Sequence, residues 1–393
     1  MTGIYIVIGS NFGDEGKGLM TGYFADSMME RSGKCLVVLS NGGAQRGHTV
    51  VRNGIRHIFS HFGSGTFAGA DTYFPREFII NPMIFMKECR NLIREVPAFG
   101  KIRIYIHPKC LVTTPFEMLT NLVLEEHRGE HRHGSVGAGI WETLIGEGKC
   151  FEELLSMDEE DIWDYLNENR RKRFEERIRQ EGVEELSAQW REILESGDLK
   201  EQFIADFTAM KNLVQVADDR ILRTYQDIIF ENGQGLLLGD RMKWRGYGDH
   251  TTPSNTGIQN PARIIRDAYA GAEQEELKIE AVYVTRTYMT RHGAGRFDTE
   301  CSLDQIDPTI RDMTNVTNES QGSLRYGKLN FQSLVKRIKR DFQDLWEYLD
   351  PEDRRLHVKY GIAMTHLNEY GCKYEHSKYV TYKSYGESRA DVI

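Results

Sequence analysis

The sequence predicts an α/β fold with a large, mostly parallel central sheet. Short β-branched and apolar runs alternate with helical patterns along most of the chain. Glycine-rich turns follow several of these runs, as at the carboxyl ends of parallel strands. One charged segment, residues 151–219, interrupts the alternation with apolar residues at helical intervals. We therefore expect a single domain, 1–393, in which 151–219 form a charged helical insertion without chemistry of its own.

Composition narrows the class of protein. With 393 residues, 40% hydrophobic and 28% charged, the chain is typical of a soluble globular protein with a large core. The net charge of −9 argues against binding to a nucleic-acid backbone. No apolar run approaches the ~20 residues that span a bilayer, and no leader precedes the first strand. Six scattered cysteines without a CxxC pair indicate reduced thiols in a cytoplasmic protein.

The first stretch, residues 4–18, predicts a phosphate-binding loop. A strand at 4–8 enters a glycine-rich turn, and a helical pattern follows. Strand, glycine loop and helix cradle phosphate through backbone N–H groups and the helix N-terminus. A standard P-loop reads Gly-Lys-Ser/Thr, but here Gly18 follows Lys17, so the magnesium-binding hydroxyl is missing. Asp14 and Glu15 in the loop indicate a metal or a proton-transfer role; solvated acids in an ordinary turn are the alternative.

A second glycine loop carries a histidine. The strand at 35–40 enters residues 41–51, which include His48. Because ligands of α/β sheets gather at the carboxyl ends of strands, we expect both loops to face one crevice. His48 could then act as a general acid or as a donor to phosphate. A hydrogen-bonded structural histidine is the alternative.

The middle of the chain continues the alternation. Asn53-Gly54 predicts a hairpin turn, 78–82 a strand ending in a turn, 83–96 a helix and 102–106 a strand. The small-residue loop 134–140 follows three histidines with basic neighbours, and an anion-facing loop is favoured over a metal cluster.

The last part adds further strand-end loops. A strand at 227–231 feeds 232–235, where the Gln234 amide could bind a base edge or a phosphate. Hydroxyls in 249–257 suit phosphate, and a strand at 281–285 enters an arginine- and glycine-containing loop. The polar stretch 314–327, with Arg325 at its tip, resembles a lid. A helix at 331–349, a strand at 360–365 and a tail at 380–387 complete the pattern.

Together these loops resemble the adenylosuccinate synthetase family. Segment 13–18, Gly-Asp-Glu-Gly-Lys-Gly, and segment 47–51, Gly-His-Thr-Val-Val, are similar to its two signatures. Looser matches lie at 233–235, 254–256, 290–295 and 384–386, in the family's order. The resemblance implies a synthetase-like fold and a ligase that joins aspartate to C6 of a purine nucleotide. A nucleoside triphosphate first phosphorylates the 6-oxo group, and the aspartate amine then displaces phosphate.

The resemblance also implies roles for individual residues. Asp14 would take the N1 proton, His48 would stabilise the transferring phosphoryl group, and Lys17 would pair with phosphate. Mg²⁺ would be held by Asp14 and the Gly47 carbonyl. Nucleotide and phosphate contacts would come from Asn11, Gly13, Glu15, Gly16, Gly18, Gln45, Thr49, Ser135, Gln234, Thr252, Ser384 and Gly386. The donor base would lie at His366 and Asn368, and aspartate would bind Arg325 and Ser323.

Three departures from the family pattern bear on the substrates. Segment 43–48 reads Gly-Ala-Gln-Arg-Gly-His where the family has Gly-His-Asn-Ala-Gly-His. Segment 321–327 holds a single arginine in place of a run of arginines. The guanine-reading Thr-Lys-Leu-Asp is Thr-His-Leu-Asn at 365–368. Since an asparagine offers donors as well as an acceptor, ATP or dATP becomes a plausible phosphate donor.

This combination resembles a divergent phage-type branch that acts on dGMP in a pathway to 2-aminoadenine in DNA, which would place the protein in the host cytoplasm. Several enzymes of that branch carry serine where this chain has Asp14. The alternatives are an ordinary synthetase using IMP and GTP, and a non-catalytic nucleotide-binding protein on the same fold. A GTPase switch is disfavoured by Gly18. The resemblance further implies a homodimer whose partner lends a basic residue.

Overall fold

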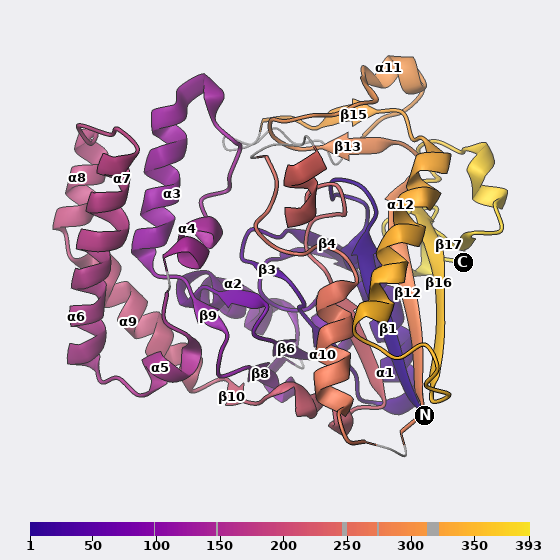
Figure 1. Cartoon of the computed structure of the whole chain (residues 1–393), viewed down its shortest axis with the longest axis horizontal. Coiled ribbons are helices and arrows are strands. Elements are labelled where there is room, and N and C mark those ends of the chain that lie inside the picture. The colour runs from indigo at the N-terminus through magenta and orange to yellow at the C-terminus, as the bar shows by residue number, and fades with distance from the viewer. Residues whose placement is uncertain (98, 147, 246–249, 273–274, 313–321) are drawn as a thin grey trace.

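A nine-stranded parallel sheet forms the centre of the molecule (Figure 1). The computed structural model describes residues 1–97, 99–146, 148–245, 250–272, 275–312 and 322–393. The strand order is β10-β8-β6-β2-β11-β1-β12-β16-β17, and each pairing is parallel. The strands are β1 Thr2–Gly9, β2 Leu36–Val38, β6 Asp71–Phe74, β8 Ile104–Ile106, β10 Gln215–Val216, β11 Asp227–Glu231, β12 Leu277–Arg286, β16 Leu356–Thr365 and β17 Val380–Lys383. The predicted fold class is confirmed.

Helices cover both faces of this sheet. Parallel strands are buried on both sides, so their side chains alternate between two cores. Val7 joins the core formed with α1 (Lys17–Ser32) and α2 (Pro82–Glu95). Ile6 joins the core formed with α10 (Gln259–Tyr269) and α12 (Phe331–Gln343). The helix predicted at 331–349 is α-helical to residue 343 and is followed by a 3₁₀ turn, Asp344–Glu347.

In the part of the chain that the structure describes, three smaller sheets lie outside the central one. The hairpin β4 (His48–Arg52) and β5 (Ile55–Phe59) turns through Asn53 and Gly54, both at positive φ, as the Asn-Gly pair predicted. A parallel group contains β3 (Gly42–Gly43), β7 (Phe78–Ile80) and β9 (Leu111–Val112). An antiparallel group contains β13 (Met289–Arg291), β14 (Glu300–Cys301) and β15 (Arg325–Gly327), with the short helix α11 (Leu303–Ile306) nearby.

The predicted lid at 314–327 needs a correction. Arg325 does not lie at a loop tip, because it begins β15 and is paired with Arg291 of β13. Residues 314–321 of the predicted lid lie outside the described residues.

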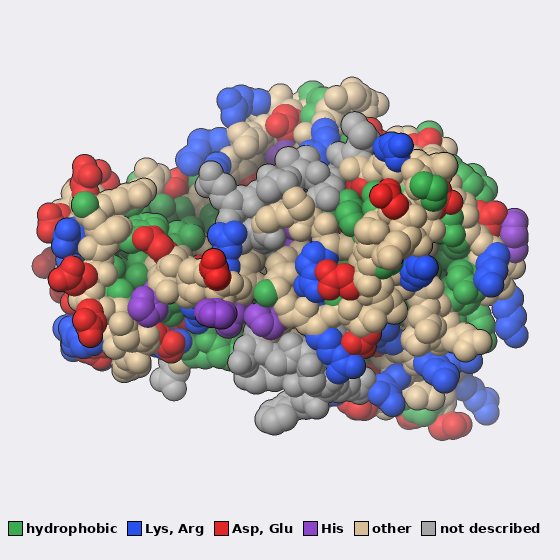
Figure 2. Space-filling model, turned by 90° about the horizontal axis from the view of Figure 1, so that it is seen from above, with side chains coloured by type: hydrophobic (Ala, Val, Ile, Leu, Met, Phe, Trp, Pro, Cys, Tyr) green, Lys and Arg blue, Asp and Glu red, His purple; other side chains and the backbone are tan. Residues whose placement is uncertain are grey.

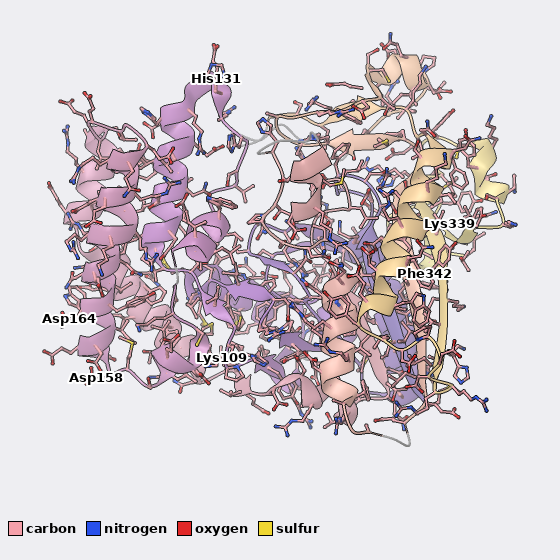
Figure 3. The ribbon with its side chains drawn as sticks, viewed as in Figure 1. Lys109, His131, Asp158, Asp164, Lys339 and Phe342 are labelled. Atoms are coloured by element: carbon pink, nitrogen blue, oxygen red, sulfur yellow. The ribbon has the colours of Figure 1, made fainter. Side chains whose placement is uncertain are left out.

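The predicted insertion forms a helical layer at one end of the sheet, on the left in Figure 1. Its inner side chains, such as Leu154 and Phe174, join the core that contains α1. Asp158 and Asp164 are exposed at its outer edge (Figure 3). The helices of this layer and its neighbours are α3 Pro115–Arg128, α4 Ile140–Ile145, α5 Phe151–Leu155, α6 Glu159–Asn169, a π-helical turn Arg170–Glu175, α7 Glu176–Gln180, α8 Ala188–Glu195 and α9 Asp198–Lys211. In the described part of the chain, no helix is long and apolar enough to cross a membrane.

Candidate active site

The predicted loops converge at the carboxyl edge of the central sheet. At the end of β16, the Thr365 hydroxyl donates to the Glu15 carbonyl at 2.9 Å, which joins that strand to the first loop. A Cβ atom on Gly18 would lie 2.7 Å from the Thr49 carbonyl, and one on Gly9 would lie 2.5 Å from the Gln234 carbonyl. The first loop therefore packs directly against the second loop and against the turn after β11. Figure 2 views the molecule from above, with His side chains and Lys or Arg side chains on the face shown.

The first loop presents an open helix N-terminus. Helix α1 begins at Lys17, and its N-cap Gly16, at φ 89°, has no side chain that could cap the helix. Uncapped N–H groups at such an end bind anions. Asp14 precedes this end at φ 56°, its side chain is 37% exposed, and Arg286 Nε donates to its carbonyl at 2.5 Å. The loop therefore offers an anion cradle beside an accessible carboxylate.

The side chain of Glu15 lies inside the first loop. Its carboxylate turns inward and accepts from the Asn11 backbone N–H, and the residue is 2% exposed. Burial raises the pKa of this carboxyl to about 7, against the opposing effect of Lys17. The Glu15 side chain therefore braces the loop from inside and is not a solvated acid, while the nucleotide contact predicted for this residue stays a prediction.

Lys17 links the two loops electrostatically. It is buried, and burial lowers the pKa of its ammonium group. The nearby carboxylates of Glu15, Asp14 and Glu231 act in the opposite direction. Lys17 therefore lies within the field of the acid in the first loop and of the acid beside His48.

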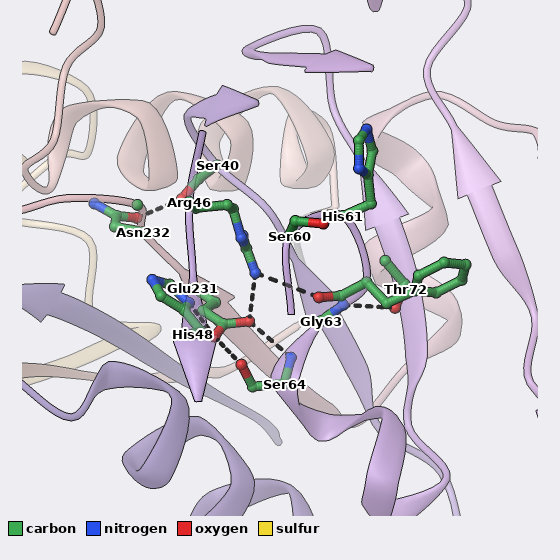
Figure 4. A network of polar contacts seen from close by, with 12 residues as sticks. Ser40, Arg46, His48, Ser60, His61, Gly63, Ser64, Thr72, Glu231 and Asn232 are labelled. Atoms are coloured by element: carbon green, nitrogen blue, oxygen red, sulfur yellow. Dashed lines mark hydrogen bonds and ion pairs between the residues drawn. The ribbon is translucent and has the colours of Figure 1, made fainter. Parts of the chain in front are cut away.

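His48 belongs to a buried polar network (Figure 4). Its Nδ1 lies 2.6 Å from Glu231 Oε1, at the end of β11. Burial lowers the pKa of His48 to about 4, with Arg46 and Lys17 acting in the same direction and Glu231 opposing them. Burial acts to raise the pKa of Glu231, but Arg46 and His48 lower it to about 2. The network thus contains an ionised carboxylate beside a neutral imidazole at neutral pH.

Several buried polar atoms at this edge lack a partner among the described residues. Both amide atoms of Gln45 and the amide oxygen of Gln234 are in this state. The two amides lie close together, since a Cβ on Gly42 would be 2.9 Å from Gln45 Nε2 and 3.5 Å from Gln234 Oε1. Buried polar groups are normally hydrogen-bonded. The two amides that the sequence predicted as nucleotide contacts are therefore placed together with their hydrogen-bonding capacity unused.

Other predicted contacts already have partners within the chain. The Ser135 hydroxyl donates to Asn121 at 2.7 Å, and its amide donates to Glu125 at 3.0 Å. The Thr252 amide donates to the Leu238 carbonyl at 2.7 Å. The Ser384 hydroxyl donates to the Gly386 carbonyl at 2.7 Å, in the turn after β17. Their nucleotide-binding roles stay predictions.

The donor-base pair lies after β16. His366 has φ 61°, and its Nδ1 lies 2.8 Å from the Thr365 hydroxyl. Burial and nearby Arg286 lower the pKa of His366 well below its usual range. Asn368 is exposed two residues on. Because Thr365 also contacts the first loop, these residues lie beside the predicted phosphate cradle.

The predicted aspartate ligand Arg325 is engaged in the structure. Its Nε donates to Glu300 at 2.7 Å, and one terminal nitrogen donates to the carbonyls of Gly293 and Gly295, each at 3.0 Å. Any carboxylate ligand would have to share or displace these contacts. Its sequence neighbour in the predicted aspartate site, Ser323, lies two residues before it.

Sequence reasoning missed Glu231, Arg46, Ser64 and Arg286. Ser64 donates to Glu231 through both its hydroxyl and its amide. Arg286 contacts Asp14 and lies 3.1 Å from Asp312. One signal for Glu231 was available, because an acid that ends a buried strand before a glycine turn needs partners nearby.

The fold and this edge define a nucleotide-binding α/β protein with an acid, a lysine and a histidine grouped at two glycine loops. The adenylosuccinate synthetase family model matches residues 6–338. The chain belongs to this family, whose enzymes are C–N ligases.

Known relatives agree with this assignment. The adenylosuccinate synthetase of Limosilactobacillus reuteri is 28% identical over 315 residues, which cover 78% of this chain and 66% of that protein. That of Photorhabdus laumondii is 25% identical, covering 77% and 67%. The chain thus spans about two thirds of the length of these relatives.

Two solved structures share the fold. A fully ligated adenylosuccinate synthetase from Plasmodium falciparum superposes with a TM-score of 0.65 at 16% identity, covering 93% of this chain and 77% of that one. The succinoaminodeoxyadenylate synthetase of cyanophage S-2L, solved with dGMP and with dATP as energy donor, gives 0.60 at 15% identity, covering 100% and 95%.

Proposed function

We propose that the protein condenses L-aspartate with the 6-oxo group of dGMP, with ATP or dATP as phosphate donor, to give 2-amino-2'-deoxyadenylosuccinate. The grouping of Asp14, Lys17 and His48 at the carboxyl edge carries the reaction type, since binding alone needs no acid in a phosphate loop. The S-2L enzyme of the same fold was solved with dGMP and dATP.

The residues divide the chemistry between them. Asp14, with an exposed carboxylate, takes the N1 proton so that O6 can attack the γ-phosphate. The α1 N-terminus and Lys17 hold phosphate oxygens. His48 faces the transferring phosphoryl group and assists departure of the phosphorylated O6 when the aspartate amine attacks C6.

Magnesium suits the donors present. Mg²⁺ takes hard oxygen ligands and usually binds one or two carboxylates together with substrate phosphates. Asp14 and the backbone carbonyl of Gly47, both at exposed residues, fit that description and would hold the ion. When bound, Mg²⁺ would neutralise charge on the donor phosphates.

The residues after β16, His366 and Asn368, indicate which base the phosphate donor carries. A guanine-reading aspartate accepts from N1–H and N2–H₂, whereas the exposed Asn368 can both donate and accept. An adenine presents a donor and an acceptor on its pairing edge, which suits an amide. We therefore propose ATP or dATP as the donor.

An ordinary synthetase reaction with IMP and GTP is the second candidate. It is favoured by the curated relatives at 25–28% identity and by Asp14 itself. A non-catalytic nucleotide-binding protein is the third.

We also propose a homodimer, which light scattering on the purified protein would test.

One assay separates the candidates. The purified protein is mixed with aspartate and Mg²⁺, then with each pairing of dGMP, GMP or IMP with ATP, dATP or GTP. We expect phosphate release and a succino-nucleotide product, identified by mass spectrometry, with dGMP and ATP or dATP. Turnover with IMP and GTP alone would support the second candidate. No release above a nucleotide-free blank with any pair would leave only binding.

A further inference from the structure

A buried carboxylate lies directly behind His48. Glu231 has no exposed side-chain surface. Its Oε1 faces His48 Nδ1 at 2.6 Å and accepts from the Ser64 hydroxyl, and its Oε2 accepts from Arg46 at 3.1 Å and from the Ser64 amide at 2.9 Å (Figure 4). Arg46 and the Ser64 amide can only donate, and beside the Arg46 cation Glu231 is ionised, so the Ser64 hydroxyl donates as well. Glu231 therefore serves as an acceptor on both oxygens.

This arrangement determines which nitrogen of His48 carries a proton. Because Glu231 accepts, Nδ1 must donate, so a neutral ring has its proton on Nδ1. Within the described residues, this is the one hydrogen bond of the His48 ring. The second ring nitrogen, Nε2, points away from Glu231 and is left for a ligand.

Arg46 and Ser64 hold the carboxylate in this pose. The Arg46 side chain is 1% exposed and also donates to the Phe62 carbonyl at 3.4 Å. Ser64 holds both carboxylate oxygens, one with its hydroxyl and one with its amide. The carboxylate is thus contacted from two segments of the chain, residues 46–48 and Ser64, and has little freedom to rotate.

We propose that Glu231 is the positioning residue of His48, and that Arg46 and Ser64 fix its orientation. Glu231 holds the imidazole in the Nδ1–H tautomer and aims Nε2 at the transferring phosphoryl group. The identity of that reacting group rests on the proposed function. A carboxylate behind a reacting histidine plays this part in hydrolase triads, where its amide variant loses activity through the wrong tautomer.

A purely structural ion pair between Arg46 and Glu231 is the competing explanation. Buried ion pairs are weak evidence for stability in themselves. Such a pair would matter for folding, and its loss would be independent of whether His48 is present. A test must therefore ask whether Glu231 acts through His48.

The first test is Glu231→Gln in the full-length protein, which keeps the side-chain shape. We expect kcat to fall at least ~100-fold, with KM for all three substrates within about 3-fold. Glu280→Gln is the matched control. Glu280 is also buried, accepts from the Tyr382 hydroxyl at 3.0 Å and pairs with Lys359 at 2.7 Å, within the sheet. That control should lower Tm with kcat within about 2-fold.

A double-mutant cycle tests whether Glu231 acts through His48. In a His48→Asn background, Glu231→Gln should change kcat by less than about 3-fold, because residues that act as a unit are not additive. If the two losses multiply instead, Glu231 does not act through His48 and the proposal fails. Ser64→Ala, which retains the amide donor, should give a smaller loss than Glu231→Gln.

The tautomer can be read without any turnover. In ligand-free protein labelled with ¹⁵N-histidine, with His48 assigned from the His48→Asn spectrum, we expect the proton on Nδ1 and its redistribution in Glu231→Gln. A wild-type proton on Nε2 would overturn the proposal. An Nδ1 proton in a protein that turns over none of the nucleotide pairs would support the positioning role while the proposed function fails.

Discussion

Asp14 occupies a backbone conformation that few side chains tolerate. Its φ of 56° is left-handed, a region that asparagine and aspartate enter more easily than other non-glycine residues. The contact from Arg286 to its carbonyl supports this conformation. The strained turn places the carboxylate at the mouth of the anion cradle, where the proposed proton transfer takes place.

Asp14→Asn should therefore preserve the fold and remove the base. Asparagine accepts the same φ, so we expect Tm within about 2 °C and a fall in kcat of roughly 10²–10⁴, the contribution of a general base. Steady-state kinetics and thermal unfolding measure both. A kcat within about 3-fold of wild type would assign the N1 proton to another group.

Residue identity could be predicted from sequence only where a residue lies in a local motif. Asp14, Lys17 and His48 could be proposed as site residues because strand, glycine and helix signals surround them. Glu231 and Arg46 were missed because their role depends on β11 lying next to β1 and near the second loop, a long-range pairing. The inward turn of the Glu15 side chain could not be predicted for a different reason, because adjacent acids look alike in a sequence.

Arg325 is part of strand β15 and is also the residue predicted to bind aspartate. It begins β15 and clamps the loop after β13 through two carbonyls. If it also binds aspartate, Arg325→Leu should raise the aspartate KM at least ~10-fold, the weight of a charge-assisted pair, with nucleotide KM within about 3-fold. Arg296→Leu, which removes an exposed pair with Asp298, is the control. A rise in every KM would indicate loss of the clamp alone.

Two glycines of helix α1 lie against β4, and only one of them is needed there. A Cβ on Gly18 would lie 2.7 Å from a backbone carbonyl of β4, the strand that begins at His48, whereas one on Gly22 would make an ordinary 3.6 Å contact with Val50. The close approach holds the helix N-terminus against the second loop. The sequence showed the glycines but not which strand lay against them.

Gly18→Ala and Gly22→Ala should thus have opposite effects. Gly18→Ala should destabilise by about 1–3 kcal/mol through overpacking and lower kcat by displacing His48. Gly22→Ala should be neutral or stabilising by up to about 1 kcal/mol, because alanine favours helix. Urea unfolding and steady-state kinetics on both variants provide the comparison. Equal effects would mean that helix α1 does not pack on β4 as described.

At the scale of the whole molecule, the fold class could be predicted from the sequence, whereas the sheet of β13, β14 and β15 could not. Continuous apolar runs marked the central parallel strands because those strands are buried on both faces. The sheet of β13, β14 and β15 uses short segments whose partners are distant in sequence. No local pattern distinguishes such segments from loops, so Arg325 was placed on a loop tip.

Stability of the whole molecule should depend on pH through buried acids and histidines acting in opposite directions. Burial raises the pKa of Asp341 from 3.8 to about 7, although the Tyr283 hydroxyl opposes this. The folded state then holds a proton that the unfolded chain releases, so stability falls as pH rises from about 4 to about 7. Burial lowers the pKa of His48 and His61 to about 4. As pH drops from 6.5 toward 4, the unfolded chain binds protons at these histidines that the folded state does not, so the stability of the folded state falls.

Asp341→Asn isolates one side of this balance away from the reacting groups. Asparagine can still accept from the Ile258 amide, as Asp341 does at 3.1 Å, but it carries no proton that pH can remove. We expect the free energy of unfolding of the variant, relative to wild type, to rise by up to a few kcal/mol between pH 5 and 8, since each pKa unit is worth about 1.4 kcal/mol. Urea unfolding at four pH values measures it. Parallel curves would show that Asp341 is already ionised in the folded protein, with its charge balanced by the donors of α10 and β12.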